Sequence, residues 1–291
     1  MKLATFSHDD STRMGVVDGD QVFDLASSDA DLPDNMLSLL EAGPGGLERA
    51  SAACASAIRI PLADVHLEAP IARPPKFFGI GLNYADHVAE SGMETPAYPT
   101  VFNKQSTCVV GPTDPLHVPR ASAVLDYEGE LGFVIGRRCR HVSREDAREV
   151  IAGYIVVNDA TVRDWQLRIP TWTIGKSFDS HGPIGPWIVT ADEISDPHQL
   201  ALRTWVNGEL RQESNTKELI FDCFDLVEHL STAFTLEPGD IIATGTPAGV
   251  GIGMKPPQLL KAGDSVRIEI EGIGVIENPV IDEPEDSAFI D

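Results

Sequence analysis

The sequence predicts an α+β fold in which a mixed β-sheet outweighs the helices, preceded by a small N-terminal α/β unit. Short apolar runs bounded by glycine or proline recur from residue 76 onward, which is typical of strands. Helical patterns are few and do not alternate regularly with these runs, which argues against a βαβ fold. A proline-rich stretch, residues 70–75, predicts a boundary between residues 1–70 and residues 71–291. A single mixed-sheet domain is the alternative.

Residues 1–70 carry signals for a hairpin and two helices. Apolar and polar side chains alternate over residues 13–25 around Asp18-Gly19-Asp20, which predicts a hairpin turn there. Helical patterns cover residues 34–42 and 46–58 and are separated by a glycine and proline run. Because nothing in this unit resembles a catalytic constellation, we expect the chemistry after residue 75.

The remaining chain predicts seven strands and three helices. The strands are expected at residues 76–81, 130–136, 153–157, 186–190, 202–206, 240–243 and 265–271. The helices are expected at residues 86–92, 144–150 and 222–231.

Charge and composition argue against several classes of function. Asp and Glu number 45 against 22 Lys and Arg, and the net charge of −23 opposes binding to nucleic acid or to an anionic membrane surface. The longest apolar stretch, residues 150–157, is too short to span a bilayer, and no signal-peptide pattern opens the chain. We therefore expect a cytoplasmic protein without membrane spans.

The four cysteines are scattered and predict reduced thiols rather than a zinc site.

Residues 126–135 place acids in what should be a strand that runs into the core. Side chains alternate along a strand, so Asp126, Glu128 and Glu130 are expected on one face and the apolar residues on the other. A divalent ion with oxygen ligands would neutralise such a cluster. A solvated sheet edge is the alternative.

Three further segments favour a catalytic site. His87 and Glu90 are spaced i, i+3 on a short helix, which suits a base and the carboxylate that orients it, although a surface ion pair is the alternative. Asp159 ends an apolar strand and lies one turn before Arg163, where it could serve a site or cap a helix. Lys176 is the one cation in an otherwise apolar stretch. Such a lysine is either a surface residue or a binder of anions and oxyanions.

A glycine loop follows the strand at residues 240–243. Residues 249–253 look like a dinucleotide fingerprint but lack its GxGxxG spacing and the helix that should follow, so we reject a Rossmann fold. Thr246 and the backbone amides of this loop could still hold a carboxylate or carbonyl group.

The chain resembles the fumarylacetoacetate hydrolase family over about residues 75–280, and its N-terminal unit is similar to the small domain of longer members. Six motifs in one order carry the resemblance: Gly-Leu-Asn-Tyr-Ala-Asp-His-Val-Ala-Glu (81–90), Asp-Tyr-Glu-Gly-Glu-Leu (126–131), Asn-Asp-Ala-Thr-Val-Arg-Asp (158–164), Gly-Lys-Ser-Phe-Asp (175–179), Val-Asn-Gly-Glu-Leu-Arg-Gln (206–212) and Gly-Asp-Ile-Ile-Ala-Thr-Gly-Thr-Pro-Ala-Gly-Val-Gly (239–251).

The resemblance implies a large mixed β-sheet roll, a homodimer and a divalent metal, usually Mg²⁺ with Mn²⁺ or Ca²⁺ as alternatives. The implied metal ligands are Glu128, Glu130 and Asp159, with Asp126 in an outer role. The implied catalytic residues are His87 and Glu90, as a dyad on a lid, and Lys176, as an oxyanion binder. The implied substrate-binding residues are Tyr84, Arg163, Gln166 and Thr246.

The implied function is Mg²⁺-dependent hydrolysis of a carbon-carbon bond in a 2,4-diketo acid, of the acylpyruvate or diketo sugar acid type. Three alternatives remain: an oxaloacetate-type decarboxylase, a keto-enol isomerase on the same scaffold, and a non-catalytic metal-containing binding protein. Leu82 stands where similar acylpyruvases carry Arg, which favours a longer or neutral substrate tail over a short dicarboxylate unless Lys104, Arg120 or Arg168 compensates.

Overall fold

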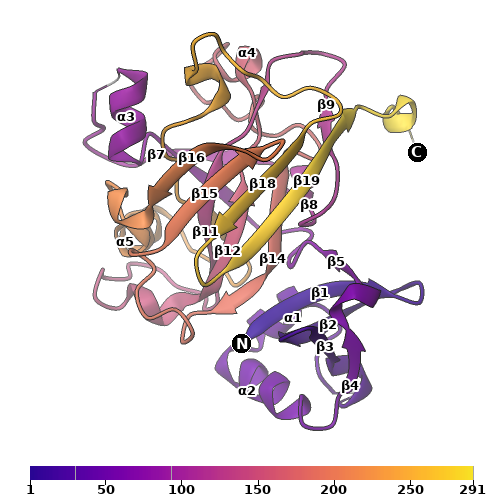
Figure 1. The fold of residues 1–291 in the computed structure, drawn as a ribbon. Helices are drawn as coiled ribbons and strands as arrows, with labels where there is room; N and C mark the ends of the chain where they lie inside the picture. The colour runs from indigo at the N-terminus through magenta and orange to yellow at the C-terminus, as the bar shows by residue number, and fades with distance from the viewer. Residues whose placement is uncertain (30, 93, 291) are drawn as a thin grey trace.

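The computed structural model describes residues 1–29, 31–92 and 94–290, and it consists mainly of two β-sheets packed on each other (Figure 1). The larger sheet has the order β4 (Ile58–Pro61), β3 (Gln21–Asp24), β2 (Ser11–Asp18), β1 (Lys2–His8), β14 (Gly182–Thr190), β12 (Ile151–Asn158), β11 (Gly129–Ile135), β17 (Ile241–Ala243), β6 (Phe77–Gly81) and β7 (Thr100–Lys104). Beside this path, β5 (His66–Glu68) pairs with β1, and β8 (Val109–Val110) pairs with β14.

The smaller sheet has the order β16 (Glu209–Asn215), β15 (Ala201–Val206), β18 (Ser265–Ile270), β19 (Gly274–Asp282) and β9 (Leu116–Val118). A separate ladder joins β10 (Leu125–Asp126) to β13 (Thr161–Val162). The α-helices are α1 (Met36–Glu41), α2 (Gly43–Ala53), α3 (Ala85–Ser91), α4 (Arg163–Gln166) and α5 (Cys223–Ala233). The pairing of β17 with β6 is parallel whereas its pairing with β11 is antiparallel, so the sheet is mixed. The predicted α+β class with a mixed-sheet roll is confirmed.

The central strands are buried on both faces. Every residue of β11 and β12 is buried. One face packs against the smaller sheet in a core that includes Phe133 and Ile268, and the other packs against the N-terminal helices through Ile155 and Leu39. Near-continuous apolar runs are what such doubly covered strands require.

The N-terminal strands continue the large sheet, because β1 pairs with β14 at Lys2↔Val189 and Leu3↔Ile188. The expected hairpin is present as β2 and β3. The glycine and proline run that we expected to separate two helices instead opens α2, because Pro44 fits the first turn of a helix, where no backbone donor is needed. The second helix also ends earlier than expected, at Ala53.

Two other expectations were wrong in detail. The acidic segment is not one strand, because β10 ends at Asp126 and β11 begins at Gly129. The helix expected at residues 144–150 is only a short 3₁₀ turn, Ala147–Val150. Among the described residues, no helix is long and apolar enough to cross a membrane.

Candidate metal centre and active site

Three buried carboxylates meet where β11 begins and β12 ends. Gly129 pairs with Asn158 in the antiparallel ladder of these strands, which brings Glu128 and Glu130 beside Asp159. One oxygen of each carboxylate lies within 4.8 Å of the others. The pairing of β11 with β12 thus places two acids of one chain segment beside a third that follows the neighbouring strand.

Three buried cations hold two of these carboxylates. The Lys176 ammonium donates to Glu128 Oε2 at 2.7 Å and to Asp159 Oδ2 at 2.6 Å. Lys104 donates to Asp159 Oδ1 at 2.7 Å, and Arg163 donates to Glu128 Oε1 at 2.6 Å. Within the described residues, Glu130 forms no ion pair with a lysine or arginine, and it accepts an N–H from Gly245 at 2.8 Å.

The pKa values follow this unequal pairing. Burial raises the pKa of the Glu130 carboxyl well above its ordinary value, and the charges of Asp159 and Glu128 raise it further. Burial also opposes ionisation of Glu128, but the charges of Lys176 and Arg163 outweigh that effect and lower its pKa to about 2. The site therefore lacks positive charge at Glu130.

These residues fit a divalent ion. Three carboxylates offer the oxygen ligands that Mg²⁺, Mn²⁺ and Ca²⁺ take. A divalent ion beside Glu130 would provide the positive charge that its surroundings lack. Lys176 already contacts Glu128 and Asp159, so its ammonium and a bound ion would compete for the same oxygens.

Asp126 anchors the glycine loop rather than joining the ligand set. Its carboxylate accepts an N–H from Gly251 at 2.8 Å and another from Ile252 at 3.0 Å. The same carboxylate accepts from Arg163 Nε at 2.8 Å. Arg163 therefore contacts both Asp126, which holds the loop, and Glu128, which belongs to the carboxylate centre.

A cavity of about 180 Å³ lies beside the carboxylates. Polar side chains on its wall come from the predicted site residues His87, Glu128, Arg163, Gln166, Lys176 and Thr246. The apolar part is formed by Ile80, Leu82, Leu167, Trp172, Val250 and Ile252. Leu82 has a φ of +56°, a left-handed conformation that is rare and strained for a leucine.

The predicted dyad is formed on α3. His87 Nδ1 lies 3.3 Å from Glu90 Oε2, and Glu90 also accepts the N–H of Gly249 at 3.1 Å. This contact engages Nδ1 and leaves Nε2 as the ring nitrogen available to a water or substrate in the cavity. The dyad is thus fixed to the loop that Asp126 holds.

Two predicted substrate residues have different surroundings. The Thr246 hydroxyl donates to Gly129 O at 3.0 Å and accepts from Gln212 Nε2 at 2.8 Å, so its one proton is already in use. Tyr84 is fully buried and is absent from the residues that form the described cavity wall. The substrate roles of Tyr84 and Thr246 stay predictions.

Sequence reasoning missed Gln212, and it assigned Lys104 a different role from the one it has beside Asp159. Lys104 also donates to His181 O at 3.0 Å and to Lys176 O, so it fixes the backbone behind the centre. The local signal for Lys104 was a lysine at the end of a short strand that contains Val101 and Phe102. Gln212 Oε1 accepts the N–H of Gly129 at 3.0 Å, a role that no local pattern indicates.

None of the three cations suggested as compensation for Leu82 lines the cavity. Lys104 is bound to Asp159. Arg120 pairs with Glu283, and Arg168 lies over the Trp165 ring. Apart from Arg163 and Lys176, the described residues that form the cavity wall include no lysine or arginine.

The sequence model described as "Fumarylacetoacetate (FAA) hydrolase C-terminal" matches residues 76–281, and one described as "Rv2993c-like, N-terminal" matches residues 1–70. The chain belongs to the fumarylacetoacetate hydrolase family. The mitochondrial oxaloacetate tautomerase fahd2 of Xenopus laevis is 43% identical over 288 residues, which cover 97% of this chain and 90% of that protein.

Solved structures of the family share the fold. Maleylpyruvate hydrolase from Sphingobium sp. SYK-6, in complex with manganese(II) ion and pyruvate, has a TM-score of 0.82 and 37% identity, covering 98% of this chain and all (100%) of that one. The 2-hydroxyhepta-2,4-diene-1,7-dioate isomerase of Mycobacterium marinum has a TM-score of 0.78 and 35% identity, covering 98% and 100%. The relatives are thus named for tautomerase, hydrolase and isomerase reactions, which supports enzyme status for this family member and leaves its reaction open.

Proposed function

We propose that this protein is a Mg²⁺-dependent hydrolase that cleaves a carbon-carbon bond of a 2,4-diketo acid, of the acylpyruvate or diketo sugar acid type. The observation that carries the proposal is one cavity lined by His87, Lys176 and Glu128, the last of which belongs to the buried carboxylate centre. The Sphingobium hydrolase, with its manganese and pyruvate, supports the same chemistry in a relative. Mn²⁺ or Ca²⁺ would be alternative metals.

Each side chain has a role in this reaction. A divalent ion held by Glu128, Glu130 and Asp159 would polarise the oxygens of the 2-oxo acid end of the substrate. His87, oriented by Glu90, takes a proton from water, and the water oxygen adds to the distal carbonyl carbon. The carbon-carbon bond then breaks, and its electron pair forms an enolate whose oxyanion the Lys176 ammonium stabilises. His87 returns the proton to the enolate carbon.

The apolar wall supports a substrate whose distal end is longer or uncharged. Leu82, Trp172 and Ile252 would contact this end, and Arg163 and Gln166 would position the acid end. A short substrate with a second carboxylate would find no cation at Leu82. We also propose a homodimer in the cytoplasm, as expected from the family resemblance and the sequence.

A turnover panel tests the function. Purified protein with Mg²⁺ or Mn²⁺ should release pyruvate or another short 2-oxo acid from a 2,4-diketo acid, more readily for apolar than for anionic tails. His87→Gln should lower kcat by a factor of about 100 or more because a general base is lost. Failure on every 2-oxo and diketo acid, with the fold and bound metal intact, would contradict the proposal.

A keto-enol tautomerase is the second candidate. It is favoured by the name of the Xenopus relative, and a dyad of His87 and Glu90 could move a proton without activating water. Such an enzyme would interconvert enol and keto forms and release no fragment. Loss of enol absorbance without release of a smaller fragment would support this candidate over the hydrolase.

A further inference from the structure

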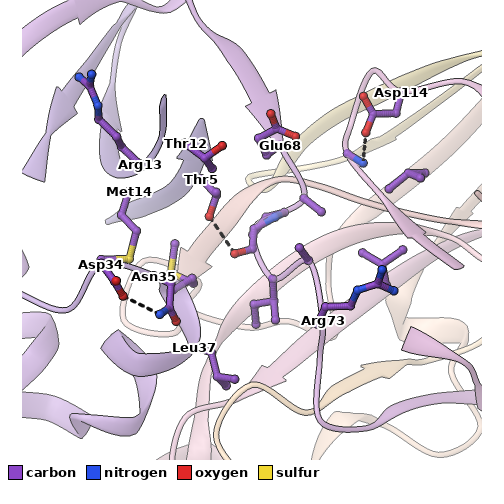
Figure 2. A pocket seen from close by; sticks show the side chains of 18 residues that line it. Thr5, Thr12, Arg13, Met14, Asp34, Asn35, Leu37, Glu68, Arg73 and Asp114 are labelled. Atoms are coloured by element: carbon purple, nitrogen blue, oxygen red, sulfur yellow. Dashed lines mark hydrogen bonds between the residues drawn. The ribbon is translucent and has the colours of Figure 1, made fainter. Parts of the chain in front are cut away.

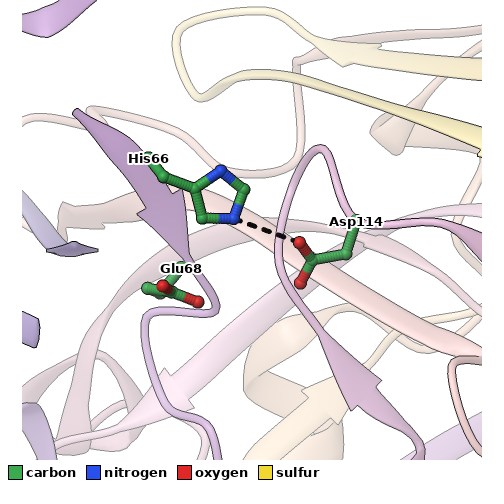
Figure 3. A group of neighbouring side chains, drawn as sticks. All are labelled: His66, Glu68 and Asp114. Carbon is green, nitrogen blue, oxygen red and sulfur yellow. Dashed lines mark hydrogen bonds and ion pairs between the residues drawn. The ribbon is translucent and has the colours of Figure 1, made fainter. Parts of the chain in front are cut away.

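We propose that His66, Glu68 and Asp114 form a second divalent-metal site, suited to a Zn²⁺-like ion, at the junction of the N-terminal strands with the rest of the chain. Figure 3 shows the three side chains close together, and none of them belongs to the carboxylate centre. One ligand atom from each lies within 4.8 Å of the other two. The ligand atoms of the carboxylate centre lie within the same distance of one another.

Two elements bring the three ligands together. His66 and Glu68 are two residues apart on β5, so the strand repeat places them on one face. Asp114 lies in the turn between β8 and β9, and its Oδ1 is 3.2 Å from His66 Nε2. The site therefore joins the region matched by the N-terminal family model to the region matched by the C-terminal one.

Each carboxylate is held by a hydrogen bond at one oxygen. Ser7 Oγ donates to Glu68 Oε1 at 2.5 Å, and the Gly111 N–H donates to Asp114 Oδ2 at 2.6 Å. This leaves Glu68 Oε2 for a ligand, and it leaves Asp114 Oδ1 in contact with His66 Nε2, so an ion would bind between these two atoms in place of their hydrogen bond. Outer partners of this kind fix the orientation of metal ligands before the ion arrives.

The charge of the cluster also calls for a cation. Among the described residues, neither Glu68 nor Asp114 pairs with a lysine or arginine, and the imidazole of His66 is the ion-pair partner of Asp114. His66 is half exposed, and such a pair contributes little. A divalent ion would neutralise both carboxylates at once.

The chemistry of the donors selects the ion. One imidazole nitrogen with two carboxylate oxygens suits Zn²⁺ or Co²⁺, whereas the three carboxylates of the other centre suit harder ions. Glu68 and Asp114 also border a cavity of about 500 Å³, shown in Figure 2, which would give water access to the remaining coordination positions. Arg13 of that cavity is already paired with Asp24 at 2.9 Å.

Zinc stoichiometry of the full-length, chelator-treated protein tests the site. We expect wild type to bind one more equivalent of Zn²⁺ than His66→Gln or Asp114→Asn, measured by elemental analysis after gel filtration. His229→Gln is the matched control, because it removes an exposed imidazole on α5. Added Zn²⁺ should raise the Tm of wild type and of this control more than the Tm of the two site variants.

A second measurement needs no variant. Zn²⁺ should protect His66, but not His229, from diethylpyrocarbonate in wild-type protein, as mapped by mass spectrometry. Equal zinc content in all four proteins, or equal modification of His66 with and without Zn²⁺, would overturn the proposal. Neither readout depends on turnover, so the outcome is independent of the proposed hydrolase activity.

Discussion

At the residue scale, the chemistry of the centre depends on a charge imbalance. Glu130 is 1% exposed and has the Gly245 N–H as a neutral partner, whereas Glu128 and Asp159 are each held by two cations. Buried carboxylates without a cation are costly to ionise. A divalent ion should therefore interact most favourably with Glu130. In the metal-free protein, ionisation of the same carboxyl group should destabilise the fold.

Glu130→Gln should stabilise the metal-free protein relative to wild type, increasingly so as the pH rises above 4.5. The reason is that the pKa of Glu130 is raised by folding from an ordinary value of 4.5, so wild type loses stability as the pH rises through the folded pKa. Urea unfolding of both chelated proteins from pH 5 to 8 measures this difference. A constant difference across that range would contradict the charge imbalance.

Lys104→Met should destabilise the metal-free protein by about 3–5 kcal/mol, because it leaves Asp159 with one cation fewer in a buried site. Lys261→Met, which changes an exposed lysine, is the control and should have almost no effect. Urea unfolding of the chelated proteins makes the comparison. Equal stability of the two variants would show that Lys104 does not support the centre.

Leu82→Arg should shift substrate preference toward dicarboxylates. Leu82 borders the cavity, and an added guanidinium there could pair with a second carboxylate of the substrate. We expect kcat/KM to rise for an oxaloacetate-like acid and to fall for an apolar acylpyruvate, by about tenfold in their ratio. An unchanged ratio would place the distal end of the substrate elsewhere.

At the element scale, the glycine loop connects the carboxylate centre to His87 and Glu90. Asp126 holds the loop through two N–H groups, and the loop in turn holds Glu90 through Gly249. Gly249 has a φ of +101°, and a Cβ there would lie 2.0 Å from Arg211 O. Only glycine fits this position without moving the loop.

Gly249→Ala should lower kcat by at least about tenfold while the fold is retained, because a displaced loop misplaces the dyad. Gly208→Ala is the matched control, since Gly208 also has a positive φ of +78° but has nothing within 4 Å of an added Cβ. The control should lose some stability and keep its kcat. Steady-state kinetics with circular dichroism would separate the two effects, and equal kcat losses would contradict the loop's role.

The sequence allowed much of this element-level account to be predicted. Apolar runs located the central strands because both of their faces are buried. The break between Asp126 and Gly129 could not be predicted, since it depends on the pairing of β10 with the distant β13, at Leu125↔Val162 and Asp126↔Thr161. Strand alternation pointed to Glu128 and Glu130, and the motif resemblance grouped them with Asp159 as implied metal ligands.

At the scale of the whole molecule, distant pairing limits what sequence reasoning can reach. The strands of residues 1–70 continue the large sheet because β1 pairs with β14, and Lys2 meets Val189. Such a contact has no local signal, so the sequence predicted a separate unit and not the shared sheet. The same distance explains why the roles of Lys104 and Gln212 were missed, because Asp159 follows β12 and Gly129 lies on β11.

The central claim is that water attacks a carbonyl group of the substrate and a carbon-carbon bond breaks. Turnover of a 2,4-diketo acid in H₂¹⁸O with Mg²⁺, followed by mass spectrometry of the products, tests it most directly. The account predicts two fragments, with one labelled oxygen in the new carboxylate of the distal fragment. Cleavage without that label, or conversion of the substrate without fragments, would contradict it.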